Sequence, residues 1–432
     1  MFQKAKEFFN KYKLYIFTAT IVVLSLIANF WEPFWIVLCC VVSLFYITCD
    51  VSELFCLFAV HTCLSGVSFL AYGICFGVGL LSVFVRYFFD LKAKRVKFYP
   101  LPFYLTTFII CVFSLIVYDI DLLGLGDGVI IISLLYSIYL VFAYRKKMQP
   151  EKVFNCLILG LLASLFVGLA LLPFKNALYY PIYYDEFYAR LKLMTYHQNM
   201  LSSFCLVSIA YLIYKLFNKI GNMIINIALI TVFLVLGLLT LSKAFAVVIA
   251  IYLFYIFVCT FKAYKKQATK ILLPIIGIVL IFAIVGHNFI SRIVDRLFAY
   301  YESGTIIQNI TTGRSTIWQL YINALTSSCT SLLFGRGLFA AQLKEIGIHS
   351  SYLFLLYRLG IVGVLLLVGL CFAYIKEGNI KFKLSFKNAL PLLSYLLISL
   401  EEMILSERCF FILIFSLFFI IDKNKEAKEE TK

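Results

Sequence analysis

The chain has 432 residues, of which 63% are hydrophobic and 14% charged, and its mean hydropathy is +0.97. A soluble globular protein is about half apolar and a quarter charged, so this composition excludes a soluble enzyme or binding domain. The formal net charge of +16 would suit nucleic-acid binding, but the basic residues are distributed as in a membrane protein. The sequence therefore predicts an all-α polytopic membrane protein with no nucleic-acid partner.

Apolar stretches long enough to cross the hydrocarbon layer recur along the whole chain. The first follows a short basic segment, but no small-residue cleavage site follows it, so we expect a retained helix rather than a signal peptide. The second to fourth come from one apolar block, so we expect about 12 to 14 transmembrane helices in one membrane domain, 1–432. The predicted spans are 14–30, 34–49, 52–70, 71–89, 101–118, 128–144, 153–172, 198–217, 222–241, 243–261, 270–287, 349–374, 389–405 and 409–421.

Lysine and arginine cluster in alternate connections between these spans, around 92–97, 145–152, 262–270 and 376–387. Basic connections stay in the cytoplasm, so we expect these loops and both termini to be cytoplasmic. The alternation leaves two long segments outside. These are 173–197 and a large loop, 288–348, for which we expect short or re-entrant helices. Loops of more than about 15 residues are usually functional, so we expect the chemistry there.

Arginine and lysine are distributed differently between the two predicted sides. Four of the 28 lysines are predicted outside, whereas seven of the ten arginines are. The planar guanidinium binds phosphate through two parallel hydrogen bonds, so this bias predicts a phosphate-bearing ligand at the outer surface. The alternative is pairing with outer acids, such as Asp185, Glu186, Asp295 and Glu302, or with lipid headgroups. The outer arginines are Arg190, Arg292, Arg296, Arg314, Arg336, Arg358 and Arg408.

Two histidines stand where each long outer segment meets the next span, His197 and His349. An imidazole there can exchange protons near neutral pH and can serve as a general base. His61 and His287 lie in or beside apolar spans, where packing is the commoner role. Thirteen cysteines show no C-x-x-C spacing, so we expect neither a disulfide framework nor a metal site, and no cofactor.

Other outer residues allow two interpretations each. Ser242 and Lys243 form a tight outer turn, in which the lysine is either a surface residue or a further cation facing the ligand. Tyrosines in both outer loops either stack on sugar rings or form an interfacial belt. These tyrosines are Tyr179, Tyr180, Tyr183, Tyr184 and Tyr188 in the first loop, and Tyr300 and Tyr301 in the second.

Five motifs in a fixed order carry a family resemblance. They are R-L-K-L-M-T-Y-H-Q-N at 190–199, L-T-L-S-K-A at 239–244, T-G-R-S-T-I-W at 312–318, F-G-R-G-L at 334–338 and H-S-S-Y-L-F-L-L-Y-R-L-G-I-V-G at 349–363. Over about residues 187–363 the chain resembles the O-antigen ligase and Wzy-type O-antigen polymerase superfamily, whose members make capsular and exopolysaccharides too.

The resemblance implies residue roles. Arg190 with Asn199 looks like the family's arginine before a helix start, Ser242 with Lys243 like its Ser-Arg turn, and Arg314 with Trp318 like its loop arginine before a tryptophan. His349 looks like its catalytic histidine. Lys243 departs from the usual arginine. Ser350 stands where asparagine is common, and Arg358 where an acidic residue is frequent, which puts the acceptor in doubt.

The implied activity is a metal-independent, inverting glycosyltransferase in the bacterial cytoplasmic membrane. Its donor would be an oligosaccharide on undecaprenyl diphosphate, and further partners would be membrane lipid, a flippase and a chain-length regulator. His349 would act as the base, and Arg190 and Arg314 as catalytic cations. The diphosphate would contact Arg190, Lys243, Arg292, Arg296 and Arg314, with support from His197, Asn199, Ser242, Trp318 and Arg358.

We expect a polymerase that joins one lipid-linked repeat unit to another. A ligase with a lipid or protein acceptor remains an alternative. A flippase or other transporter of lipid-linked oligosaccharide is the alternative from another class. A transporter is expected to carry charged residues along a cavity at midplane depth, whereas here the predicted span centres are nearly free of charge.

Overall fold

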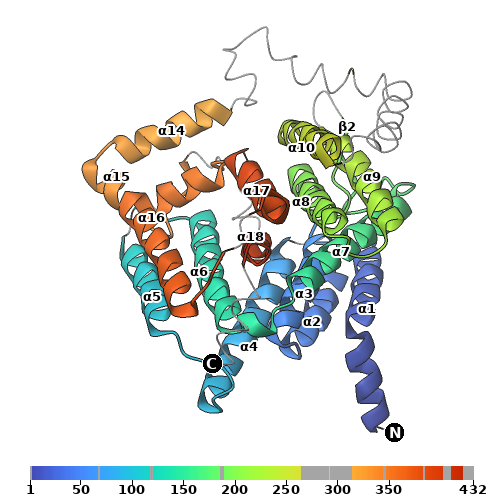
Figure 1. Ribbon diagram of the computed structural model, residues 1–432, viewed down its shortest axis with the longest axis horizontal. Coiled ribbons are helices and arrows are strands. Elements are labelled where there is room, and N and C mark those ends of the chain that lie inside the picture. Colours follow the sequence, from blue (N-terminus) through green and yellow to red (C-terminus); the bar gives the residue numbers. More distant parts are fainter. Residues whose placement is uncertain are drawn as a thin grey trace.

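The computed structural model describes residues 2–66, 69–116, 118, 120–184, 189–263, 291, 314–343, 347–382, 385–401 and 410–421. Helices dominate these residues, and one short antiparallel hairpin is the sheet (Figure 1). The helices are α1 Phe2–Ala28, α2 Phe34–Ile47, α3 Val51–Thr62, α4 Phe69–Lys92, α5 Pro100–Leu115, α6 Leu122–Ala143, η1 Arg145–Lys147, α7 Pro150–Leu171, α8 Gln198–Phe217, α9 Met223–Leu239, α10 Lys243–Ala263, α14 Arg314–Thr326, α15 Cys329–Phe334, α16 Ser351–Gly378, α17 Phe386–Glu401 and α18 Phe410–Leu417; the strands are β1 Ile182–Tyr184 and β2 Ala189–Leu191.

The prediction of an all-α, multi-pass membrane protein is confirmed. Among the described residues, five helices are long and apolar enough to cross a membrane, namely Tyr72–Lys92, Leu122–Ala143, Pro150–Leu171, Gln198–Phe217 and Ser351–Gly378. The other helices contribute shorter apolar stretches of 10 to 17 residues, such as Tyr12–Ala28 and Lys243–Tyr255, so the total of 12 to 14 spans stays a prediction. The predicted span 270–287 lies outside the described residues.

The predicted boundary between the third and fourth spans is wrong. We expected a span over 52–70, but α3 ends at Thr62, and its 12 residues rise only about 18 Å. The turn that follows is buried beneath the segment 173–197, because the Gly66 amide donates to the Met194 carbonyl at 2.8 Å. A Cβ at Gly66 would lie 2.5 Å from the Tyr179 ring, so this contact requires glycine. The first long loop therefore packs into the bundle.

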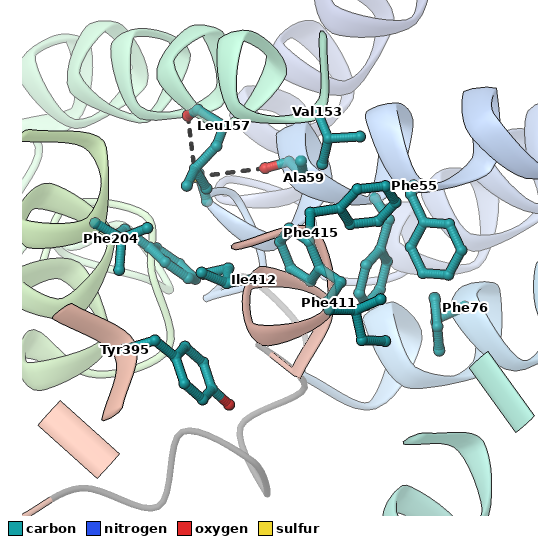
Figure 2. Packing of buried hydrophobic residues seen from close by; sticks show 14 of the residues in the cluster. Phe55, Ala59, Phe76, Val153, Leu157, Phe204, Tyr395, Phe411, Ile412 and Phe415 are labelled. Carbon is teal, nitrogen blue, oxygen red and sulfur yellow. Dashed lines mark hydrogen bonds between the residues drawn. The ribbon is translucent and has the colours of Figure 1, made fainter. Parts of the chain in front are cut away.

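The core is built where α3, α4 and α18 meet (Figure 2). The Phe55 ring centre lies 5.2 Å from that of Phe415, and Phe58 lies 5.2 Å from Phe411 and 3.8 Å from Phe76. The hydrophobic effect contributes little to helix association inside a membrane, because the lipid tails are as apolar as the side chains. Close packing of such side chains therefore holds the helices together. In α8, every residue from Gln198 to Ile213 is buried, which makes α8 a central helix.

The two ends of the bundle carry different residues. At the end that holds the loops 93–99, 144–149 and 379–382, here called the lysine-rich end, Arg145 donates to the Tyr99 hydroxyl at 2.7 Å and to the Gly378 carbonyl at 3.1 Å. At the other end, here called the hairpin end because it holds β1 and β2, the Asn29 side chain accepts from the Tyr179 amide at 3.0 Å. In Figure 1, α1 begins at the bottom, whereas β2 and α14 lie at the top. Which end faces the cytoplasm stays a prediction.

The described part of the large loop is anchored on a break in α16. Gly360, with φ of 60° and ψ of −172°, interrupts the helix, so the carbonyls before it are available to other donors. The Arg336 amide donates to the Tyr357 carbonyl at 2.8 Å, and the Gly337 amide to the Arg358 carbonyl at 3.1 Å. A Cβ on Gly360 would lie 2.3 Å from the Gly335 nitrogen, so only glycine allows this approach.

The Arg358 side chain also stabilises this junction between the large loop and α16. It is completely buried, and its Nη2 lies 2.6 Å from Asp127 Oδ2 on α6. Its Nη1 donates to the Leu338 carbonyl at 3.0 Å and to the Ala340 carbonyl. Gln342 donates to the same Asp127 oxygen at 3.0 Å. A carboxylate and two carbonyls thus accept hydrogen bonds from Nη1 and Nη2, and the carboxylate offsets the buried charge, as burial of a charge requires.

A first prediction concerns the side of the membrane on which α14 lies. Gln319 is exposed on α14, so a Gln319→Cys variant lacking Cys329 should react on intact cells with a maleimide that cannot cross membranes. Lys97→Cys, exposed at the lysine-rich end, serves as the matched control and should react only after lysis. The reverse pattern would invert the topology.

A second prediction concerns the buried ion pair. Arg358→Leu should cost about 3 to 5 kcal/mol of stability, because it leaves the Asp127 carboxylate buried without its counter-ion. Asp127→Leu introduced into that variant should then cost less than Asp127→Leu alone, with a coupling energy of about 1 kcal/mol or more. The cycle is measured by the thermal stability of wild type, the two single variants and the double variant, all purified in one detergent. Additive losses would show that the pair makes no net contribution.

Candidate functional site

Arg190 lies at the centre of the hairpin end. The strands β1 and β2 pair antiparallel with Tyr183 opposite Arg190, and this pairing directs the guanidinium toward the start of α8. Only 6% of Arg190 is exposed. Its Nε donates to the Thr240 carbonyl, and its Nη2 to Asn199 Oδ1, each at 2.9 Å. Arg190 therefore joins the hairpin, α8 and the turn between α9 and α10, three segments that are distant in sequence.

The turn between α9 and α10 presents its carbonyl to Arg190 through its backbone shape. Thr240 caps α9, and Leu241 adopts a left-handed φ of 54° that reverses the chain. The Ser242 hydroxyl accepts from the Phe245 amide at 3.4 Å and so begins α10. Lys243 is half-buried as the first residue of α10. The predicted group Arg190, Asn199 and Ser242 is thus brought together around one turn.

The helix α14 lies against the segment that carries His349. Arg314 and Trp318 are four residues apart and share one face of α14. The Trp318 indole donates to the Ile348 carbonyl at 3.1 Å, directly before His349. His349 has a left-handed φ of 50°, and Ser350 caps α16 by accepting from the Leu353 amide at 3.5 Å. Among non-glycine residues, histidine adopts this φ more often than most, so the segment before α16 can turn at this position.

Charged residues of the hairpin and of α14 affect the pKa values of the two histidines. The pKa of His197 is lowered from 6.5 to about 3, mainly by burial and further by Arg190, His349, Arg314 and Lys192. The pKa of His349 is lowered by burial and by the positive charge of Arg314. Both imidazoles are therefore neutral near pH 7, the form that accepts a proton. A general base is most effective when its pKa lies near the working pH, which favours His349 over His197.

Lys192 is a site residue that the sequence analysis did not identify. Its Nζ lies 3.7 Å from the centre of the Tyr179 ring, and burial lowers its pKa. It directly follows β2, and its amide donates to the Pro181 carbonyl at 3.0 Å. A lysine two residues after Arg190 in an extended segment was the signal that could have identified it. Arg190 and Lys192 both contribute to the lowered pKa of His197.

The tyrosines of the first loop have different environments. Tyr179 is packed, because its hydroxyl donates to the Thr195 and Tyr196 carbonyls and its face is covered by Lys192. Tyr183 and Tyr184 are 42% and 63% exposed, and Tyr180 stacks on Tyr184 with ring centres 6.5 Å apart. The exposed pair can still meet a sugar ring. Tyr188, Tyr300 and Tyr301 lie outside the described residues.

Several other predicted residues do not join this group. Arg358 was expected to support the diphosphate site, but its guanidinium is buried against Asp127 and has a structural role. Arg336 donates to the Ala324 carbonyl at 2.8 Å and ties α14 to the loop after α15. Arg292 and Arg296 lie outside the described residues. His61 packs in the core, where its Nδ1 lies 2.9 Å from the Tyr46 hydroxyl.

A third prediction follows from the lowered pKa of His197. Its folded pKa is below the unfolded value of 6.5, so the unfolded chain binds more protons and the stabilisation is lost as pH falls from about 6.5 toward 3. His197→Asn keeps a side-chain cap for the Asn199 amide but removes this titration. Melting temperatures of the variant should fall less than those of wild type between pH 7 and pH 4.5. Equal acid sensitivity would contradict the burial of a neutral imidazole.

No protein-family model matches this chain, and no curated protein or solved structure is significantly similar to it. The fold and the site geometry are therefore the basis for any functional assignment. The resemblance of residues 187–363 to the O-antigen ligase and polymerase superfamily stays a prediction. It concerns motifs whose residues Arg190, Asn199, Ser242, Arg314 and His349 occupy the hairpin end of the bundle.

Proposed function

We propose that this protein is a polysaccharide repeat-unit polymerase that works on the outer face of the bacterial cytoplasmic membrane. It would transfer a glycan from undecaprenyl diphosphate to a sugar hydroxyl of another lipid-linked repeat unit. One observation supports this most strongly: Arg190 is bonded to Asn199, two residues after His197, and α14, which begins with Arg314, is bonded through Trp318 to the carbonyl before His349. Cations suit the diphosphate, and a neutral imidazole suits the acceptor hydroxyl.

The diphosphate would bind to the arginines. The Arg190 guanidinium donates to the Thr240 carbonyl and to the Asn199 amide oxygen, each at 2.9 Å. These bonds fix its orientation at the hairpin end, where a guanidinium can bind a phosphate oxygen. Arg314 begins α14 beside His349, and Lys192 and Lys243 add charge nearby. Such fixed cations stabilise negative charge that develops on a leaving group.

His349 would act as the base. As the acceptor oxygen attacks the anomeric carbon, its proton passes to the imidazole, and the bond from that carbon to the diphosphate oxygen breaks. The electron pair leaves with the diphosphate, and the single displacement inverts the anomeric carbon. Donor binding would aid this step. Burial and, to a lesser extent, the charge of Arg314 lower the pKa of His349; a phosphate anion beside Arg314 would offset the second cause and so strengthen the base.

The alternatives differ in what accumulates in a strain that lacks the protein. Single repeat units in place of long chains indicate a polymerase, whereas long chains left on the carrier lipid indicate a ligase. Accumulation of lipid-linked oligosaccharide on the cytoplasmic side indicates a flippase. We expect single repeat units, because the cations gather at one end of the bundle, near a base, where a displacement on a lipid diphosphate can take place.

A fourth prediction concerns the arginines. Arg190→Lys and Arg314→Lys should each lower polymer formation from purified lipid-linked repeat units by about tenfold or more, because lysine keeps the charge but loses the planar fork. Arg336→Lys is the matched control, because Arg336 donates to the Ala324 carbonyl and the Ser327 hydroxyl and does not contact Arg190 or His349 in the described residues. Polymer formation by this variant should stay near that of wild type. Full activity of both site variants would contradict recognition by the guanidinium.

A fifth prediction concerns His349. Asparagine tolerates the left-handed backbone, so His349→Asn removes the base while keeping the fold. The rate of polymer formation should fall by about 10²- to 10⁴-fold, with donor binding largely retained. His197→Asn should be milder, because a pKa near 3 makes His197 a poor base. An active His349→Asn enzyme would exclude the proposed base, and loss of donor binding in this variant would assign His349 to the diphosphate site.

A further inference from the structure

A cavity of about 420 Å³ lies at the lysine-rich end, between α1, α3 and α7. It is remote from the proposed active site, because Lys13 and Lys152, which line it, belong to the opposite end of the bundle. Its volume falls in the range of small-molecule sites. The polymerase proposal gives this cavity no role.

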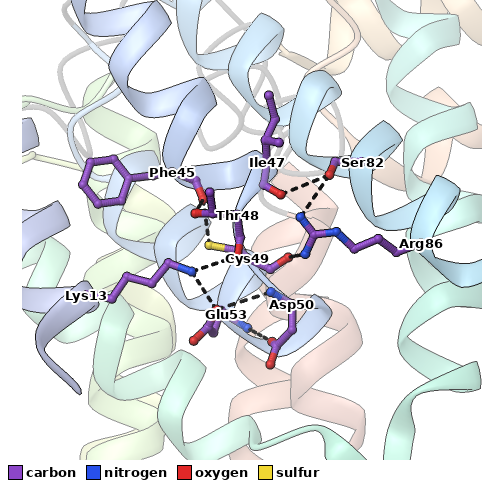
Figure 3. A network of polar contacts seen from close by, with 9 residues as sticks. All are labelled: Lys13, Phe45, Ile47, Thr48, Cys49, Asp50, Glu53, Ser82 and Arg86. Atoms are coloured by element: carbon purple, nitrogen blue, oxygen red, sulfur yellow. Dashed lines mark hydrogen bonds and ion pairs between the residues drawn. The ribbon is translucent and has the colours of Figure 1, made fainter. Parts of the chain in front are cut away.

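The rim of the cavity carries one cation in excess. Lys13 Nζ lies 2.9 Å from Glu53 Oε2 and donates to the Thr48 carbonyl at 3.1 Å (Figure 3). Glu53 is also held in a capping box with Asp50, so its carboxylate is already satisfied. Lys152 is exposed on α7, and its ammonium has no hydrogen bond or ion pair within the described residues. The remaining positive charge at the rim is that of Lys152.

The wall becomes apolar with depth. On α7 the lining passes from Lys152 to Leu159, seven residues or about 10 Å along the helix axis. On α3 it passes from Glu53 to Leu57, about 6 Å further from the rim, and Leu14 of α1 adds to the same wall. A charged rim above an apolar wall fits an amphiphile whose anionic group stays at the interface and whose chain enters the bundle.

We propose that this cavity binds the phosphate headgroup of an anionic phospholipid of the leaflet at the lysine-rich end. Basic pockets between transmembrane helices on the cytoplasmic side commonly hold such headgroups. The ammonium groups of Lys152 and Lys13 contact the phosphate, and the first acyl carbons lie along Leu57 and Leu159. The basic segment with Lys4, Lys6 and Lys11, at the start of α1, attracts the same leaflet.

The test compares lipids retained by the purified full-length protein in native mass spectrometry, after mixing with phosphatidylglycerol or phosphatidylcholine. Wild type should retain more phosphatidylglycerol than phosphatidylcholine. Lys152→Glu should reduce that retention at least about fivefold, because an exposed cation near anionic lipid is replaced by a like charge. Lys92→Glu is the matched control, being exposed at the same end but outside the cavity, and should retain the lipid as wild type does.

Leu159→Phe fills the apolar wall without changing any charge, and it should lower retention independently of Lys152. Inorganic phosphate, added alone at millimolar concentration, should not replace the lipid or raise the melting temperature. Equal retention by wild type and Lys152→Glu would overturn the proposal. Stabilisation by inorganic phosphate, without retained phosphatidylglycerol, would show a free-anion site and would also overturn it. Neither outcome depends on glycan transfer, so the proposed polymerase activity is tested separately.

Discussion

The hairpin end depends on the buried guanidinium of Arg190, which joins three segments that are distant in sequence. Arg190 is 6% exposed, and its two bonds at 2.9 Å tie the hairpin to the start of α8 and to the turn after α9. A cation in such a place lowers the free energy of a nearby anion more than an exposed cation does, because less water screens its charge. Burial, and after it the charge of Arg190, lowers the pKa of His197, so this imidazole is neutral near pH 7.

Two buried arginines of this chain each join segments that are distant in sequence. Arg358 is paired with the Asp127 carboxylate and with two carbonyls of the loop that follows α15, so its charge is offset within the fold. Arg358 thereby fastens the large loop to the break in α16. Arg190 donates to an amide oxygen and a carbonyl, and these bonds join the hairpin to α8 and to the turn after α9.

The helices were largely predictable, because an apolar run of about 20 residues has few alternatives in a membrane. Helices α2, α4 to α10 and α16 to α18 begin within six residues of their predicted spans. The end of α3 at Thr62 could not be predicted, because it depends on a contact between Gly66 and Met194, which are far apart in sequence. Hydropathy contains no information about such a contact.

The site was predictable in part. Motif order indicated Arg190 with Asn199 and Arg314 with Trp318, and both pairs are held at the hairpin end. Lys192 was missed, because the region was interpreted as a loop and the alternation of a strand was not considered. The partner of Arg358 could not be known, since Asp127 lies 231 residues away in sequence. Charge counts thus identified the kind of residue but not its partner.

The central claim is that a diphosphate binds beside a neutral His349. Nuclear magnetic resonance of histidine-labelled protein measures it directly, because the chain has only four histidines and His349→Asn identifies the signal. The pKa of His349 should lie below 6.5 in the free protein and should rise when undecaprenyl diphosphate is added, as the anion offsets Arg314. A pKa that does not change at saturating undecaprenyl diphosphate would contradict the account.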